Sequence, residues 1–388
     1  MKLELKKHKY YLLVLTAMFF VLIYLFVPEG SVFGSNTDWM SQHAELAETL
    51  RDACLSQGTI FPDFLWLGGG SNAYEFSYYG YLRPDILIGC LLPQVPMIYI
   101  LIFSMMACVL ASGLLGYYFL IQNHMEPFAA FIGSTFLMTA GCFFQAHRQV
   151  MFVNYMPFLC AAFLGVDKYV EEKKKALLLC SVCGMILTSF FFSIGGLLAL
   201  GIYGASRFTE RGIKVFLKDS ISLAGVLFHG VLLCGILLIP TAFVLLGRGG
   251  NGSQAEAVVS LFTVQPMRFL YTPHGVGLSA LALIALFDGM VCKRKWQEKM
   301  LPVSLFLIFT IPFVGYVLNG GLYDKGKVFI PFLPLMCMEV AKYIDRIRER
   351  KNSFWDILPY LITAVFLIAG KTFWALLDCG IMLLCFLI

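Results

Sequence analysis

The sequence predicts an all-α polytopic membrane protein, and three observations lead to that class. Hydrophobic residues make up 59% of the 388-residue chain, charged residues make up only 14%, and the mean hydropathy is +0.78. A soluble domain carries roughly 25% charged residues. Long apolar runs recur along the chain, and most Lys and Arg residues lie in short clusters between them. Because lipid cannot satisfy open backbone groups, the segments that cross it must be helices.

Spanning the hydrocarbon layer takes about 20 apolar residues, and about 11–12 segments of the chain meet that need. The first segment follows a basic N-terminus, and its length and bulky side chains indicate an uncleaved span rather than a signal peptide. The two segments that meet around residues 190–196 are short enough to form a broken or re-entrant unit. The expected spans cover residues 10–28, 96–121, 127–144, 150–166, 176–191, 193–207, 219–246, 275–292, 301–318, 328–342, 354–370 and 372–388.

The distribution of basic residues orients these helices. With the N-terminus in the cytoplasm, 21 of the 29 Lys and Arg residues fall in cytoplasmic segments and eight in outer segments. Basic residues of membrane proteins concentrate on the cytoplasmic side. We therefore expect a single membrane domain over residues 1–388. It has a first extracytoplasmic loop with amphipathic helices over residues 29–95 and a second one over residues 247–275.

Several classes of protein are excluded by motifs that the sequence lacks. It has no nucleic-acid-binding motif, no Walker A motif, no HExxH and no GxSxG. Few ionisable residues fall within the expected spans, which argues against a proton-coupled transporter. Most of the twelve cysteines lie inside apolar runs, which argues against a disulfide framework.

The first outer loop carries eight acidic residues, and Asp38 stands out among them by its position. It lies just beyond the outer end of the first span, at the start of a short amphipathic helix expected over residues 37–56. A carboxylate at that position can act as a general base on a hydroxyl group at the membrane surface. Asp38 can equally cap the helix, and the residues alone leave both interpretations open.

Aromatic and polar residues of the outer loops are candidates for substrate binding. Tyr78 and Tyr79 lie in a Tyr-rich stretch that fits either an interfacial belt or stacking against a sugar ring. His43 and Asp63 are polar candidates in the same loop, and His274 belongs to a weaker group in the second outer loop.

Basic residues on the outer side run against the charge bias, and we predict that they bind an anionic partner. His147 and Arg148 lie at the outer mouth of two spans, while Lys325 and Lys327 follow a short Gly-rich turn. An Arg side chain can bind a phosphate through two parallel hydrogen bonds. A snorkelling Arg148 is the alternative for the first cluster, and neutralisation of a lysine by Asp324 is the alternative for the second.

Longer stretches of the chain resemble the YfhO family of bacterial membrane proteins. The resemblance begins with Asp38 and Gln42 and continues in GGGSNAYEFSYYGYLRPDILI and HRQVMFVNYMPFLCAAFLGVDKY. It is also carried by FFFSIGGLLALGIYG, LLIPTAFVLLGRG and KVFIPFLPL, so that it extends from about Asn36 to Leu335. Typical family members are far longer and have an extracytoplasmic C-terminal domain, so we expect a short or truncated member.

The YfhO family is similar to GT-C glycosyltransferases, multispan helical enzymes that use polyprenyl-phosphate-linked sugars on the outer face. The resemblance implies a GT-C-like bundle in the bacterial cytoplasmic membrane that glycosylates a cell-envelope polymer such as teichoic acid. In the GT-C pattern an acidic residue of the first outer loop is the base, and Asp38 matches that position. The implied partners are the polyprenyl-phosphate sugar lipid, the polymer acceptor and membrane lipids. No cofactor is certain, and a divalent metal at the acidic site stays open.

Two other functions remain open at this point. The chain can be a transporter or flippase of lipid-linked precursors, which would need a path through the membrane and alternating access. It can also be a non-catalytic scaffold for envelope assembly. A structure discriminates in part, because the enzyme requires Asp38 to share a cavity with Arg148 and with Lys325 or Lys327.

Overall fold

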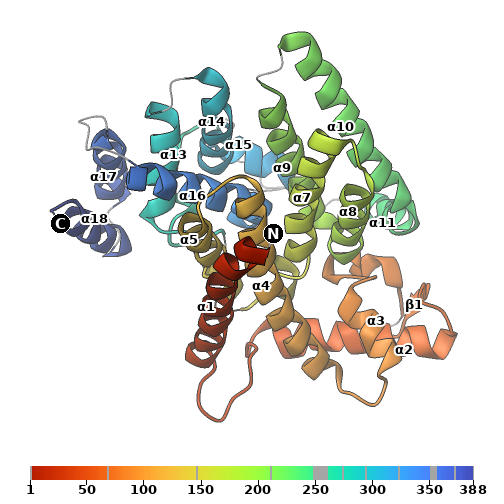
Figure 1. Cartoon of the computed structure of the whole chain (residues 1–388). Coiled ribbons are helices and arrows are strands. Elements are labelled where there is room, and N and C mark those ends of the chain that lie inside the picture. Colours follow the sequence, from red (N-terminus) through yellow and green to blue (C-terminus); the bar gives the residue numbers. More distant parts are fainter. Residues whose placement is uncertain are drawn as a thin grey trace.

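The computed structural model is an almost entirely helical bundle, which confirms the all-α polytopic class (Figure 1). It describes residues 2–67, 70–145, 147–209, 212–247, 261–272, 275–292, 295–321, 324–349, 356–370 and 373–387. The strands of the described residues form one short hairpin, in which β1 (Phe64–Leu65) pairs antiparallel with β2 (Ser71–Asn72). The chain is therefore a multi-pass membrane protein in which helices carry the whole architecture.

Six helical stretches of the described residues are long and apolar enough to cross a membrane, or seven if a bent pair counts as one span. Two of these stretches combine a short helix with a longer neighbour. The six are α1 (Lys2–Phe26), α4 (Met97–Gln122), α5 (Pro127–Met138) with α6 (Gly141–Phe144), η3 (Val150–Phe152) with α7 (Met156–Glu172), α9 (Phe190–Phe208) and α10 (Ile213–Leu233).

The remaining expected spans are shorter or interrupted helices. The segment expected as one span over residues 219–246 is divided between α10 and α11 (Gly235–Gly247) at Cys234. The segment expected over residues 301–318 bends by 80°. The other helices of this half are α13 (Ala280–Val291), α14 (Trp296–Thr310), α15 (Pro312–Leu318), η5 (Pro266–Phe269), η6 (Gly326–Phe332), α16 (Leu333–Glu349), α17 (Leu358–Gly370) and α18 (Phe373–Leu387).

Two helix breaks coincide with a single extended residue. Ile311 precedes Pro312, whose ring excludes the helical conformation from the residue before it, and Ile311 is accordingly extended. Ser189 is also extended and separates α8 (Ala176–Thr188) from α9. The sequence predicted an interruption near this point. The break brings the first residues of α9, beginning at Phe190, to one end of the bundle.

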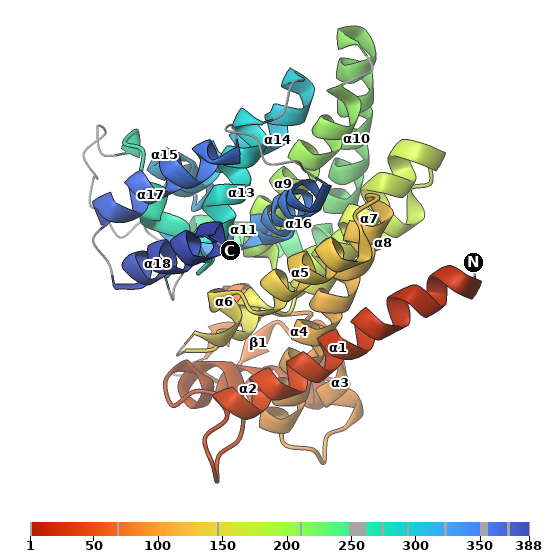
Figure 2. The same ribbon diagram turned by 60° about the vertical axis from the view of Figure 1, so that its left-hand side comes forward.

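The segment between α1 and α4 forms a compact layer at one end of the bundle, which we call the Asp38 end (Figures 1 and 2). In both views this orange layer lies below α7, α8, α9 and α10. It contains η1 (Trp39–His43), α2 (Ala44–Gln57), η2 (Ala73–Tyr79) and α3 (Pro84–Leu91). The sequence predicts a single helix over residues 37–56, whereas the structure has a π-helical turn, η1, followed by α2.

Helix α7 lies at the centre of the packing and is buried along most of its length. It packs against α4, α8 and α9, and the rings of Phe119, Phe163 and Tyr203 meet where three of these helices converge. Gly165 allows α8 to approach closely, because a Cβ atom there would lie 2.7 Å from the backbone of Leu178. This rigid centre fixes the helix ends on which the site is built.

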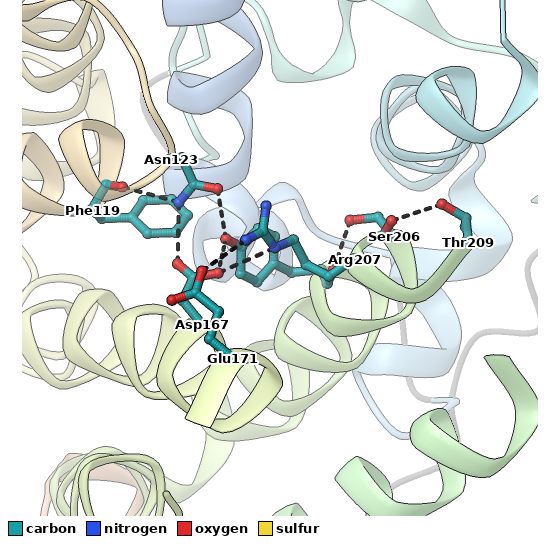
Figure 3. Close-up of polar contacts among 8 residues, drawn as sticks. Phe119, Asn123, Asp167, Glu171, Ser206, Arg207 and Thr209 are labelled. Atoms are coloured by element: carbon teal, nitrogen blue, oxygen red, sulfur yellow. Dashed lines mark hydrogen bonds and ion pairs between the residues drawn. The ribbon is translucent and has the colours of Figure 1, made fainter. Parts of the chain in front are cut away.

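A buried polar network joins three helices at the end opposite to Asp38 (Figure 3). The Asp167 carboxylate on α7 accepts hydrogen bonds from Tyr203 Oη at 2.6 Å and from Asn123 Nδ2 at 3.2 Å. Arg207 Nε lies 3.4 Å from Asp167 Oδ1. Because Asp167 is almost fully buried, these hydrogen bonds and this ion pair offset the cost of removing its charge from water.

Asp167→Leu is expected to lower the free energy of unfolding by about 1–3 kcal/mol, because Tyr203, Asn123 and Arg207 would each lose one of their acceptors and the network would lose its central carboxylate. Asp167→Asn keeps an acceptor oxygen and should cost less. Unfolding of the purified protein in mixed micelles by increasing SDS measures both. Equal stability of Asp167→Leu and the wild type would contradict this role.

Candidate functional site

A cavity of about 1080 Å³ opens at the Asp38 end, where seven segments that are distant in sequence come together. Acidic, basic, amide and aromatic side chains all contribute to its walls. The lining residues are Asp38, Gln42, Tyr78, Tyr79, His147, Gln149, Met151, Phe152, Phe190, Phe191, Ile194, Leu245, Arg268, Thr272, Leu318, Asn319, Gly320, Asp324, Lys325, Gly326 and Lys327.

Asp38 faces this cavity as a hydrogen-bond acceptor and does not cap its helix. It occupies the N-cap position of η1, but its side chain makes no capping hydrogen bond. Oδ1 accepts from Gln42 Nε2 at 3.2 Å, and Oδ2 accepts from Gln149 Nε2 and lies 3.3 Å from His147 Nδ1. The carboxylate is thus held by three side chains and remains partly exposed, which leaves room for a ligand hydroxyl.

The turn between α6 and η3 holds the Asp38 segment in place. Trp39 is buried, and its Nε1 donates to the Arg148 carbonyl at 2.8 Å. The Arg148 side chain donates to the carbonyl oxygens of Gly34 and, at 2.7 Å, of Phe26. Arg148 therefore ties down the chain that leads from α1 to Asp38, and it lines a different cavity.

His43 lies behind the cavity wall. Its side chain is buried, and Nε2 lies 3.0 Å from Gln149 Oε1. Burial, helped by the nearby Arg83 guanidinium, lowers the pKa of His43 from 6.5 to about 4. His43 therefore contacts Asp38 only through Gln149 and cannot touch a ligand in the cavity directly.

Three basic side chains line the same cavity as Asp38. Lys327 Nζ donates to the Tyr78 hydroxyl at 2.8 Å and lies over the rings of Tyr78 and Phe191. Lys325 is exposed at the rim. Arg268 forms an ion pair with Asp324 and lies over a buried Phe ring. Asp324 was expected as a possible partner of a lysine, and the structure pairs it with Arg268 instead.

Aromatic rings form the wall between the acidic and basic groups. Tyr78 and Tyr79 come from η2, and Phe190 and Phe191 come from the start of α9. Burial, and then the charge of Asp38, raise the pKa of Tyr79, so that its hydroxyl stays protonated. These rings provide an apolar surface against which a flat or ring-shaped ligand can pack.

The structure brings together six of the residues that were predicted to form the site: Asp38, Tyr78, Tyr79, His147, Lys325 and Lys327. Three others lie elsewhere. His43 is behind the wall, Asp63 is exposed and away from the cavity, and Arg148 binds backbone carbonyls. His274 is outside the described residues.

The cavity also has polar residues that did not emerge as sequence candidates: Gln42, Gln149, Thr272 and Asn319. Arg268 belongs to the same weaker predicted group of the second outer loop as His274. Gln42 lies one helical turn after Asp38, a spacing that indicates contact along a helix. Gln149 directly follows His147 and Arg148, but a neutral amide produces no charge signal. Arg268 has the same outer-side charge anomaly as Lys325 and Lys327, and that anomaly is the signal by which it can be recognised.

A divalent metal at Asp38, which the sequence left open, does not fit the surrounding side chains. Across the described ranges, no group of three or more His, Cys, Asp or Glu side chains could hold a metal ion. Gln149 presents its amide N–H to Asp38 Oδ2, and a donor at that position competes with a cation for the carboxylate. We therefore derive no chemistry from a metal.

The fold and cavity define a class: an all-α, multi-pass membrane protein with a polar cavity at one end of the bundle. The family model for the bacterial membrane protein YfhO matches residues 11–378, and the chain belongs to this family. No curated protein matches the sequence.

Proposed function

We propose that this protein is a membrane glycosyltransferase that moves a sugar from a polyprenyl-phosphate carrier to a hydroxyl group of a cell-envelope polymer. The observation that carries this proposal is the cavity that Asp38 shares with Lys325, Lys327 and Arg268. The expectation that Arg148 lines this cavity was wrong, because Arg148 lines a different one, and Arg268 supplies the guanidinium group instead. A transfer of this kind needs one base for the acceptor and cations for a phosphate, and both are present. Membership of the YfhO family is consistent with this role.

The basic residues are suited to binding the phosphate of the donor. Lys327 and Lys325 carry point charges within the cavity, and Arg268 adds a guanidinium group beside Asp324. Cations stabilise negative charge as it develops on a leaving phosphate, an effect that grows where water is excluded. The ring of Tyr78, under Lys327, would lie next to the sugar that the phosphate carries.

Asp38 is suited to act as the general base. As the acceptor oxygen attacks the anomeric carbon, its proton passes to the Asp38 carboxylate, and the bond between that carbon and the phosphate oxygen breaks. The products are the glycosylated polymer, the polyprenyl phosphate and protonated Asp38, which returns its proton to water. The donors Gln42 and Gln149 keep the carboxylate oriented toward the cavity.

We further propose that the Asp38 end faces the outside of a bacterial cytoplasmic membrane and that the N-terminus is cytoplasmic. The basic clusters support this orientation. Lys173, Lys174 and Arg207 lie at the end of the bundle opposite to Asp38, where short loops join the helices. A donor carried on the outer leaflet would then reach the cavity directly.

Single cysteines test the orientation in a cysteine-free background. Asp52→Cys, at an exposed site near Asp38, should react with a membrane-impermeant maleimide in intact cells. Lys174→Cys, at an exposed site of the opposite end, should react only after the cells are permeabilised. The reverse pattern would invert the topology and remove the outer cavity on which the proposal rests.

Reconstitution separates the enzyme from a flippase. Proteoliposomes are given a polyprenyl-phosphate sugar labelled in its sugar, together with purified envelope polymer. We expect the label to enter the polymer. Movement of the intact lipid across the vesicle membrane without transfer would instead support a flippase. If the protein neither transfers sugar nor moves the lipid, the scaffold function is the one that remains.

A further inference from the structure

The amide of Gln149 can have only one orientation in this structure. An ionised carboxylate accepts hydrogen bonds and donates none, so the side of the amide that faces Asp38 Oδ2 must be the Nε2 group. The carbonyl oxygen Oε1 then faces His43 Nε2 across 3.0 Å and must accept from it. The proton on His43 is therefore on Nε2.

The other nitrogen of His43 has no proton. Nδ1 is buried and has no hydrogen-bond partner among the residues that the structure describes. A second proton there would add an unpaired charge in a side chain that is 1% exposed. His43 is thus a neutral donor with one fixed tautomer.

Burial, and after it the charge of Arg83, keeps His43 neutral by lowering its pKa. The Arg83 guanidinium lies nearby, held by Asp85 through contacts of 2.9 and 2.5 Å, and both side chains are buried. Arg83 also donates to the Tyr79 carbonyl at 2.5 Å. The charges of Asp38 and Asp85 raise the pKa of His43, but burial and the charge of Arg83 lower it by more. The lowered pKa leaves His43 neutral near pH 7.

We propose that His43 and Gln149 form a positioning relay that fixes the Asp38 carboxylate in its ionised, cavity-facing orientation. This inference rests on the proposed function, in which Asp38 is the base. His43 prevents the Gln149 amide from turning over, because a turned amide would place two N–H donors against each other. Gln149 in turn presents a permanent donor to Asp38. His43 does not line the cavity, and Gln149, which does, acts in this relay through its hydrogen bond to Asp38.

Other charged and titratable groups also surround the Asp38 carboxylate. His147 and Tyr79 approach the carboxylate from the cavity wall, and Gln42 contacts its other oxygen. Lys325, Lys327 and Arg268 with Asp324 line the same space. Among these groups, the Tyr79 ring packs against His43, and Phe in place of His43 keeps that ring contact, so a change at Asp38 would report on the relay.

His43→Phe and His43→Gln test the relay as a matched pair. Phe fills the space but cannot donate, whereas the Nε2 group of Gln can replace the lost donor. In purified protein, a water-soluble carbodiimide couples glycine ethyl ester to the protonated Asp38 carboxyl, and mass spectrometry of the peptide gives the extent at each pH. We expect the midpoint for Asp38 to rise by about one pH unit in His43→Phe, because a donor to the ionised form is lost. It should return toward the wild-type midpoint in His43→Gln.

Two results would overturn the relay: an unchanged midpoint in His43→Phe, or an equal shift in both variants. Gln149→Met provides a second route if His43→Phe does not fold, because it removes the direct donor and should raise the midpoint further. The titration needs no substrate. A shifted midpoint together with sugar transfer that does not depend on Asp38 would keep the relay and refute the proposed function. An unshifted midpoint together with sugar transfer that depends on Asp38 would refute the relay alone.

Discussion

Asp38→Asn should reduce sugar transfer to the envelope polymer by about 10²–10⁴-fold, the range that general-base catalysis contributes. Asn has the same shape as Asp, its oxygen can still accept from Gln149, and the Gln42 amide can turn over to accept from its NH2 group, so the fold should be retained. It cannot take the proton of the acceptor hydroxyl. The measurement is the sugar content of the purified polymer from cells that express each variant at equal abundance.

Asp52→Asn is the matched control for this substitution. Asp52 lies on α2 in the same layer, its side chain is 68% exposed, and it does not line the cavity. It should leave the sugar content unchanged. If Asp38→Asn also retained wild-type transfer, Asp38 could not be the base.

Lys327→Met should raise the KM for the lipid donor by about tenfold or more, the effect expected when one hydrogen bond to a charged group is lost. Met can still pack against the rings of Tyr78 and Phe191 but cannot pair with a phosphate. We expect most of the loss in the KM for the donor, which is measured with purified protein and a concentration series of polyprenyl-phosphate sugar.

Lys174→Met removes a lysine charge at the opposite end of the bundle and should leave the donor KM unchanged. Lys327→Arg should recover part of the loss because it keeps the positive charge. A donor KM that responds equally to Lys327→Met and Lys174→Met would mean that net charge, and not a phosphate site, governs donor use.

The helices of the bundle are predictable from sequence because hydrophobic length is a strong local signal. Their interruptions are less so. The bend of 80° before Pro312 was missed although the proline is visible, because an apolar run of sufficient length resembles one span. The break at Cys234 has no proline or charge to mark it. Such breaks depend on the packing of neighbouring helices, which a local pattern does not contain.

The site shows a similar division. Asp38, Lys325 and Lys327 are accessible to sequence reasoning because topology makes each of them exceptional in position or charge. Arg148 has the same exceptional charge, but its side chain turns toward the carbonyl oxygens of Phe26 and Gly34. Charge patterns identify which residues need an acceptor. They do not distinguish a ligand phosphate from a backbone carbonyl.

Purified protein in liposomes provides the most direct test of the central claim, that the cavity bounded by Asp38 and the basic residues transfers sugar from a lipid phosphate. The donor is labelled in both its sugar and its lipid, and the acceptor is the envelope polymer. We predict that the wild type releases one polyprenyl phosphate for each sugar that enters the polymer and that Asp38→Asn does neither. Lipid that remains intact in the presence of folded wild-type protein, donor and acceptor would contradict the claim.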